Sequence, residues 1–119
     1  MRSLVIKCTA GADEPERCSQ AFTVAAAAIA SGADVALWLT GEAAWFGLPG
    51  RAEDFELPLS GSLAEARDLV LESGDLVICT QCAARRGIVA GDLLPGARIS
   101  GATAFTEAVL ADGVQALVY

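Results

Sequence analysis

The chain has 119 residues and a formal net charge of −7, and this length fits one domain over residues 1–119. An acidic surface repels phosphate groups, which disfavours binding to nucleic acids and to anionic membranes. Hydrophobic residues make up 54% of the chain, a high share for a chain this short, which buries only about two thirds of its unfolded surface. We therefore expect a homo-oligomer.

The first half of the chain predicts two strands joined by a helix. Residues 4–6 form an apolar run typical of a strand buried on both faces. Residues 14–31 predict a helix, with Pro15 in its first turn and a glycine directly after its end. Residues 34–40 predict the second strand, and residues 41–59 predict a loop with one short helix.

The second half alternates helices with short strands, the pattern of a parallel sheet covered by helices. Ser62 and Glu65 have the spacing of a capping box at the start of a helix. The predicted elements are a helix over 62–73, a strand over 75–79, a helix over 80–86, a strand over 98–100, a helix over 103–111 and a strand over 114–119. The sequence thus predicts an α/β fold with about five strands in βαβ order.

No segment of the sequence predicts a membrane span or a targeting signal. The longest apolar run, residues 24–30, is much shorter than the roughly 20 residues that cross a bilayer, and the amino end has no signal-peptide pattern. We expect a cytoplasmic protein, where thiols stay reduced.

Reactive and aromatic side chains are expected at one edge of the predicted sheet. In open α/β sheets, ligands bind beyond the carboxyl ends of the strands. Cys8 ends the first strand and Cys79 ends the third, while Trp45 and Phe46 follow the second. This edge is therefore where a functional site is expected.

Cys79 and Cys82 form a CxxC motif at the junction of a strand and a helix. The N–H groups at a helix start carry a partial positive charge, which favours a thiolate. Arg85 and Arg86 follow Cys82 by three and four residues, so they share its helix face and add positive potential. Such a setting makes a cysteine nucleophilic. The alternative is that both cysteines are buried as small apolar side chains.

Four cysteines without a histidine also allow a tetrathiolate zinc or iron–sulfur site. Paired CxxC motifs are the strong signal for such a site, and this chain has one CxxC, with Cys8 and Cys18 ten residues apart. A metal is therefore disfavoured, and Cys8 and Cys18 are expected to be structural. A thioredoxin-like dithiol is disfavoured too, because nothing follows a thioredoxin sequence pattern.

Three further features of the sequence bear on function. The acidic residues Asp13, Glu14 and Glu16 are expected to be solvated, because negative charge suits the start of a helix. Trp45 and Phe46 are expected to line a pocket or, preferably, a subunit interface. The glycines form neither a P-loop nor a dinucleotide fingerprint, so no nucleotide site is predicted.

Several segments together resemble a known family. They are Ile78-Cys79, Arg85-Arg86-Gly87-Ile88, Arg98-Ile99-Ser100-Gly101, Phe105-Thr106-Glu107-Ala108 and a final hydrophobic strand. The opening also agrees, with a strand, a polar turn and an alanine-rich helix led by Ala21-Phe22. Over nearly its whole length the chain resembles the DsrE/DsrF-like family, and within it the sulfur-carrier subunits of the TusD/DsrE type.

The resemblance implies a three-layer α/β/α fold with a mostly parallel five-stranded sheet, assembled into dimers, trimers or hexamers, and no cofactor. It also implies that Cys79, rather than Cys82, accepts sulfane sulfur as a persulfide and passes it to a partner protein. Two features depart from the relay subunits. Cys82 stands where they have a small apolar residue, and residues 42–59 show no clear match.

Three functions stay open at this point. The first is an intracellular sulfur-relay protein or sulfurtransferase, with Cys79 as the nucleophile and Arg85 or Arg86 stabilising its thiolate. The second is a thiol–disulfide redox switch, because Cys82 can resolve a persulfide into a disulfide. The third is a non-catalytic oligomeric interaction module whose cysteines only pack.

Overall fold

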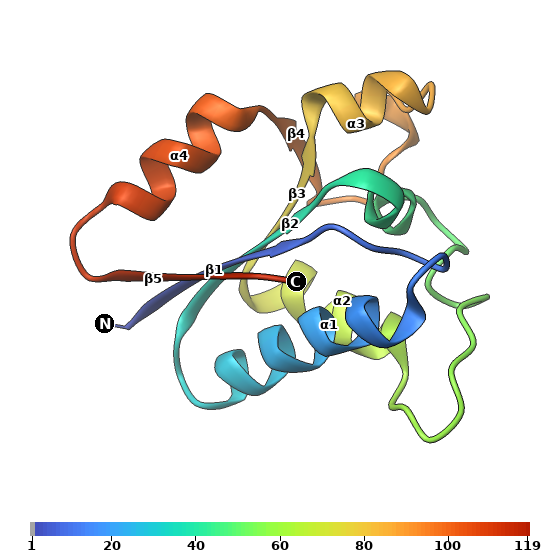
Figure 1. Ribbon diagram of the computed structural model, residues 1–119, viewed down its shortest axis with the longest axis horizontal. Helices are drawn as coiled ribbons and strands as arrows, with labels where there is room; N and C mark the ends of the chain where they lie inside the picture. The colour runs from blue at the N-terminus through green and yellow to red at the C-terminus, as the bar shows by residue number, and fades with distance from the viewer. Residues whose placement is uncertain (1) are drawn as a thin grey trace.

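The computed structural model describes residues 2–119 and contains the predicted alternation of strands and helices (Figure 1). In chain order the elements are β1 (Ser3–Cys8), α1 (Pro15–Ala30), β2 (Asp34–Leu39), the 3-10 helix η1 (Gly41–Gly47), α2 (Leu63–Ser73), β3 (Asp75–Cys79), α3 (Thr80–Arg85), the 3-10 helix η2 (Ala90–Asp92), β4 (Arg98–Ser100), α4 (Ala102–Leu110) and β5 (Val114–Val118). The predicted elements are confirmed to within two residues at their ends, and η2 is an addition.

The five strands form one sheet in the order β4-β3-β2-β1-β5. Every neighbouring pair is parallel, so the sheet is wholly rather than mostly parallel. In a parallel sheet all carboxyl ends lie at the same edge. The turns that follow β1, β2 and β3 therefore meet at one edge of the molecule (Figure 1).

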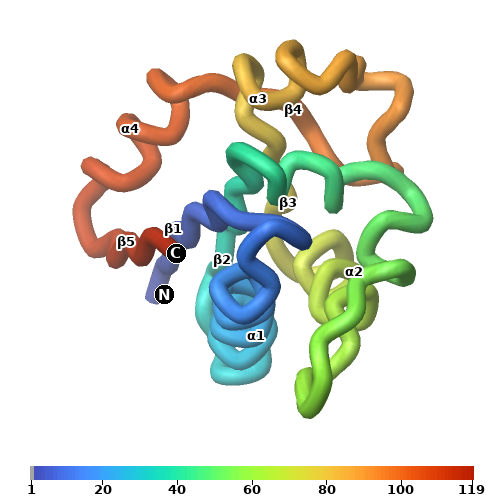
Figure 2. The backbone as a smooth tube through the Cα atoms, turned by 45° about the vertical axis from the view of Figure 1, so that its right-hand side comes forward, coloured from blue at the N-terminus to red at the C-terminus, as the bar shows by residue number. Residues whose placement is uncertain are grey.

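The sheet lies between two layers of helices, which confirms the three-layer α/β/α fold. Helices α1 and α2 lie side by side below the sheet, and α4 lies on the opposite face (Figures 1 and 2). The larger core fills the space between the sheet and the helices α1 and α2 and includes Phe22, Leu37 and Ile78. A smaller cluster, with Trp38 and Val77 buried at its centre, lies beneath α4.

Local chemistry explains where two of the helices begin. Pro15 occupies the first turn of α1, where its missing N–H costs no hydrogen bond. The hydroxyl of Ser62 accepts a hydrogen bond from the N–H of Glu65 at 3.1 Å and thereby caps α2. None of the helices within residues 2–119 is long and apolar enough to cross a membrane.

The α4 layer is thin compared with the layer of α1 and α2. Helix α4 has no buried residue, although most of its side chains are apolar. Residues 115–118 of the edge strand β5 are exposed as well, and Leu110 and Val118 are 76% and 66% exposed. An apolar surface therefore remains open along α4 and β5.

Candidate functional site

Cys79 lies at the carboxyl edge of the sheet, where β3 passes into α3. It is the last residue of β3 and the N-cap of α3, and its side chain is partly exposed. Side chains alternate along a strand. Ile78 packs in the core under α1 and α2, whereas Val77 lies beneath α4. Cys79 therefore points to the α4 side of the sheet.

The surroundings of Cys79 favour its thiolate. Burial raises the pKa of this thiol, but four groups act in the opposite direction and together lower the pKa below its ordinary value. These groups are the backbone N–H groups of Cys82 and Gln81, the thiol of Cys82 and the positive charge of Lys7. The Gln81 side-chain oxygen also lies 3.7 Å from the Cys79 sulfur, as an acceptor for the protonated thiol.

Cys82 faces the turn after β2. Its sulfur accepts a hydrogen bond from the N–H of Gly41 at 3.1 Å. Gly41 has a φ of 54°, and a Cβ at this position would lie 2.7 Å from the carbonyl oxygen of Thr9. Only glycine fits this close approach, so the start of η1 is held against both α3 and the end of β1.

The two arginines of α3 have different surroundings. Arg86 binds Glu42 through two guanidinium nitrogens, at 2.7 and 2.9 Å, and also donates to the carbonyl of Cys82. Its charge is thus compensated by a carboxylate of η1. Arg85 is exposed and forms no ion pair within the described residues 2–119. The charged group that lowers the pKa of Cys79 is Lys7.

Lys7 is a site residue that the sequence reasoning missed. It lies on β1, and its Nζ sits 4.1 Å from the centre of the Phe105 ring of α4. One signal was available, because Lys7 is the only lysine of the chain and interrupts the apolar run before Cys8. The alternation of side chains then places Lys7 on the face opposite Cys8.

Cys8 and Cys18 lie away from this site. Both are fully buried, as predicted for structural cysteines, in the core under α1 and α2. Cys8 donates to the carbonyl of Ala10 at 3.2 Å. A hydrogen bond with Cys8, together with burial, raises the pKa of Cys18 far above its ordinary value, so the Cys18 thiol stays protonated.

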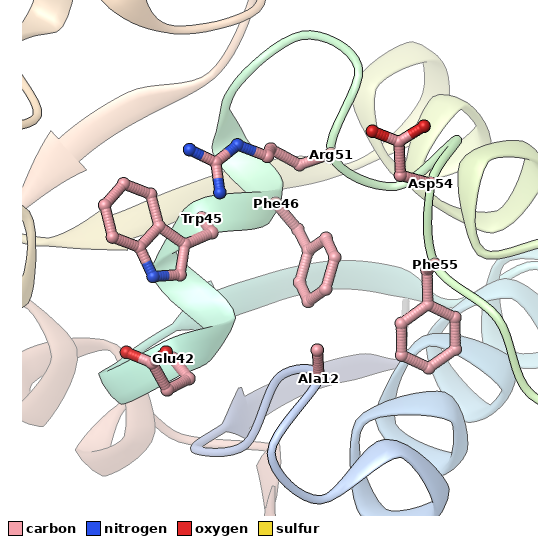
Figure 3. Close-up of a pocket in the computed structure, with 7 residues that line it drawn as sticks. All are labelled: Ala12, Glu42, Trp45, Phe46, Arg51, Asp54 and Phe55. Atoms are coloured by element: carbon pink, nitrogen blue, oxygen red, sulfur yellow. The ribbon is translucent and has the colours of Figure 1, made fainter.

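A cavity of about 400 Å³ opens beside η1 (Figure 3). Arg51 stacks over Trp45 at 4.5 Å, and the rings of Phe46 and Phe55 meet edge to face at 5.7 Å. The cavity is also lined by Glu42, the partner of Arg86, but not by Cys79. The preference for a subunit interface is wrong for Phe46, because this side chain is 5% exposed and packs in the chain's own core.

The acidic residues at the start of α1 lie in solvent. Asp13, Glu14 and Glu16 are exposed at the start of α1, as expected, and Asp13 accepts a hydrogen bond from the N–H of Gly11. Across residues 2–119 no three histidine, cysteine or carboxylate side chains are grouped as metal ligands. Cys79 points to the α4 side of the sheet, whereas Cys8 and Cys18 lie in the core on the other side. The four sulfurs therefore cannot bind one metal ion together.

Comparison with known proteins decides the family. The sequence matches the model of the DsrE/DsrF-like family over residues 2–118. The chain belongs to this family. Among curated proteins, none matches its sequence. The family expected from the sequence is thereby confirmed.

Two solved structures are similar to this DsrE/DsrF-like protein. One is the YchN protein of E. coli, with a TM-score of 0.81 and 21% identity over 100% of both chains. The other is MTH1491 of Methanobacterium thermoautotrophicum, described as a protein of unknown function, with a TM-score of 0.72 and 13% identity over 100% of both chains. At these identities the similarity shows the shared fold.

Membership in the DsrE/DsrF-like family associates the chain with sulfur relay in general terms. All four of its cysteines are free thiols. Cys79 differs from the other three, since it combines partial exposure with a lowered pKa. Reactive thiols have this combination of access and thiolate character.

Proposed function

We propose that this protein is a sulfur-relay protein that accepts sulfane sulfur on Cys79 as a persulfide and passes it to a partner protein. The observation that carries the proposal is the setting of Cys79, a partly exposed thiol at the carboxyl edge of the sheet with a lowered pKa. A thiolate, rather than a thiol, attacks sulfur. Membership in the DsrE/DsrF-like family also supports a role in sulfur relay.

The proposed transfer consists of two displacements at sulfur. The Cys79 thiolate attacks the outer sulfur of a donor persulfide, R–S–SH. A new sulfur–sulfur bond forms on Cys79 while the donor bond breaks, and the donor leaves as its thiolate RS⁻. An acceptor thiolate then attacks the outer sulfur on Cys79. The outer sulfur passes to the acceptor, and Cys79 is released as a thiolate again. No cofactor takes part.

The neighbours of Cys79 have distinct roles in this proposal. The N–H groups of Gln81 and Cys82 stabilise negative charge on the Cys79 sulfur. Arg86 holds α3 against η1 through Glu42, and Arg85, which is exposed, offers a positive charge to an incoming anionic donor. Cys82 also acts on Cys79, since its thiol and its backbone N–H are among the groups that lower the pKa of Cys79.

The test is to load the reduced protein with a low-molecular-weight persulfide and to map the added sulfur by mass spectrometry. Cys79 and Cys82 fall in one tryptic peptide, residues 68–85, so fragment ions must assign the sulfur to one of them. Cys8 and Cys18 lie in separate peptides and serve as internal controls, because both are buried. The proposal expects one added sulfur atom on Cys79.

Two variants complete the experiment. Cys79→Ser should take up no sulfur, whereas Cys82→Ser should still load Cys79. If the parent gains no sulfur on Cys79, or if Cys79→Ser loads as well as the parent, the relay proposal is lost. The protein would then fit a non-catalytic interaction module.

A thiol–disulfide switch is the second candidate, favoured by the CxxC spacing and by the Cys82 thiol, which is among the groups that lower the pKa of Cys79. In this reaction the Cys82 thiolate attacks the inner sulfur of a Cys79 persulfide, which forms a Cys79–Cys82 disulfide and releases HS⁻. Sulfide release from the parent but not from Cys82→Ser would favour the switch. A persulfide that persists until an acceptor thiol is added would favour the carrier.

We also propose that the working form is a homo-oligomer in a reducing compartment such as the cytoplasm, with sulfur donor and acceptor proteins as its partners. The exposed apolar residues of α4 and β5 support the oligomer, since they include Leu110, Leu117 and Val118. The four free thiols support a reducing compartment.

A further inference from the structure

Lys7 and Cys79 project from the same face of the sheet near its carboxyl edge. In the register of the sheet, Lys7 lies opposite Trp38, and Trp38 lies opposite Val77. Trp38 and Val77 are buried beneath α4. Cys79 follows Val77 by two residues and therefore lies on the same face, one step closer to the carboxyl edge.

The Phe105 ring, which itself packs on Trp38, holds the Lys7 side chain in place. Its ammonium group lies 4.1 Å from the centre of the Phe105 ring, and Phe105 meets Trp38 edge to face with ring centres 5.3 Å apart. Such a cation–π contact contributes about 0.5–1 kcal/mol at an exposed site and more where water is excluded. Lys7 is half-buried, so its charge is fixed near the sheet rather than dispersed in solvent.

Within residues 2–119 no carboxylate forms an ion pair with Lys7. On the same face, Arg98 and Asp75 pair with each other at 2.9 Å. The acidic residue of α4, Glu107, is exposed. Of the groups around Cys79, Cys82 supplies a thiol and N–H, and Lys7 supplies the positive charge.

We propose that Lys7, held by the Phe105 ring that packs on Trp38, is an electrostatic positioning residue of the Cys79 site. It stabilises the thiolate before transfer and the negatively charged outer sulfur of the persulfide after transfer. This role rests on the proposed function only for the second part, since the effect on the thiolate can be measured without any sulfur donor. Residues of β1 and α4 thereby take the role that was expected of Arg85 or Arg86 in α3.

The test is the pH profile of Cys79 alkylation by iodoacetamide, measured in a Cys82→Ser background. The buried Cys8 and Cys18 react slowly in folded protein, so the rate reports Cys79. Lys7→Met removes the charge and keeps an unbranched apolar stem. Its profile should move to higher pH, with alkylation about three- to tenfold slower at pH 7, and Lys7→Arg should restore most of the rate.

Two charge-matched variants serve as controls. Arg2→Met removes a positive charge at the opposite edge of the sheet, where Arg2 donates to Ser31, and should leave the profile in place. Arg85→Met tests the competing assignment to α3. The proposal is overturned if Lys7→Met has the parent's profile, or if Arg85→Met or Arg2→Met shifts it as far as Lys7→Met does.

Chemical modification covers the case in which Lys7→Met does not fold. Lys7 is the only lysine. With the thiols reversibly blocked, acetylation of the folded protein therefore removes the charge of Lys7 and that of the terminal amine, whereas reductive methylation keeps both. Acetylation should slow the alkylation of Cys79, and methylation should not; equal effects would overturn the proposal. Failure of persulfide loading in the parent would remove the relay function but leave this alkylation result intact, so the two failures are distinguishable.

Discussion

Arg67 is the buried charged side chain of the described structure, with 3% of its surface exposed. Its guanidinium is fully engaged, since it binds both carboxylate oxygens of Glu53 at 2.7 and 2.8 Å and also reaches Asp68. Glu53 belongs to the loop whose neighbouring residues Asp54 and Phe55 line the cavity beside η1, and Arg67 belongs to α2. The ion pair between Glu53 and Arg67 thus connects this loop to α2.

This ion pair predicts an acid-sensitive contribution to stability. The Arg67 guanidinium lowers the pKa of Glu53 from 4.5 to about 2 in the folded protein. A carboxyl with a lowered folded-state pKa stabilises the fold above its unfolded-state pKa and loses this effect as the pH falls toward its folded-state value. Glu53→Gln should therefore be less stable than the parent at pH 7, and the difference should shrink from about pH 4.5 downward.

Urea unfolding of both proteins between pH 7 and pH 3 checks this prediction. Glu56→Gln is the matched control, since Glu56 lies in the same loop and is exposed without an ion pair in residues 2–119. A difference between parent and Glu53→Gln that does not change with pH would contradict the role of the ion pair.

At the residue scale, sequence reasoning identified the reactive cysteine but not the charge beside it. Cys79 was predictable because a strand end, a helix start and a CxxC motif coincide within the four residues 79–82. The pairing of Arg86 with Glu42 joins residues 44 positions apart, and the contact of Lys7 with Phe105 depends on how α4 packs on the sheet. No local pattern encodes either contact.

At the element scale, the turn between β2 and η1 depends on a glycine. A Cβ at Gly41 would lie 2.7 Å from the Thr9 carbonyl, and its φ of 54° is costly for other residues. Gly50 has a φ of 83° but no atom within 4 Å of such a Cβ. A side chain at Gly50 would therefore meet backbone strain alone, whereas a side chain at Gly41 would meet both backbone strain and steric overlap.

Alanine substitutions should reflect this difference. Gly50→Ala should lower the free energy of unfolding by about 1 kcal/mol, from the left-handed backbone alone. Gly41→Ala should cost about 2–4 kcal/mol, because overpacking adds to the same strain. Urea unfolding measures both values, and an equal loss in the two variants would refute the close approach of Gly41 to β1.

The start of α2 offers a second prediction at this scale. Ser62 caps the helix through its hydroxyl, so Ser62→Ala should lower the free energy of unfolding by about 1 kcal/mol. Ser73 is the exposed last residue of the same helix, and Ser73→Ala should change stability by less than about 0.5 kcal/mol. Thermal unfolding of the pair provides the measurement; a Ser62→Ala protein as stable as Ser73→Ala would exclude the cap.

The elements themselves were predictable because local signals agree with the packing. Buried parallel strands have short apolar runs as their sequences, which makes them recognisable. Proline, glycine and the serine cap mark the ends of the helices. The loop of residues 48–62 gave no such signals. Its conformation depends on long-range contacts, such as that of Glu53 with Arg67 and that of Phe55 with Phe46.

At the scale of the whole molecule, the two helical layers are unequal. The layer of α1 and α2 buries the larger core, whereas α4 covers only the small cluster around Trp38. The high apolar content of the sequence indicated surface beyond what one chain buries. The structure places much of that surface on α4 and β5, which the sequence alone did not locate.

The proposed homo-oligomer is tested on this surface by the double variant Leu110→Lys/Val118→Lys. These side chains are 76% and 66% exposed, so the substitutions leave the core of the chain unchanged. If α4 and β5 form the contact between copies, the lysines bring uncompensated charge into an apolar interface, and the variant should become monomeric.

Leu59→Lys is the matched control, since Leu59 is fully exposed on a loop outside α4 and β5. Light scattering coupled to size-exclusion chromatography should give an oligomer for the parent and for Leu59→Lys, and a monomer for the double variant; a monomeric parent, or an oligomer that survives both lysines, would rule out this interface.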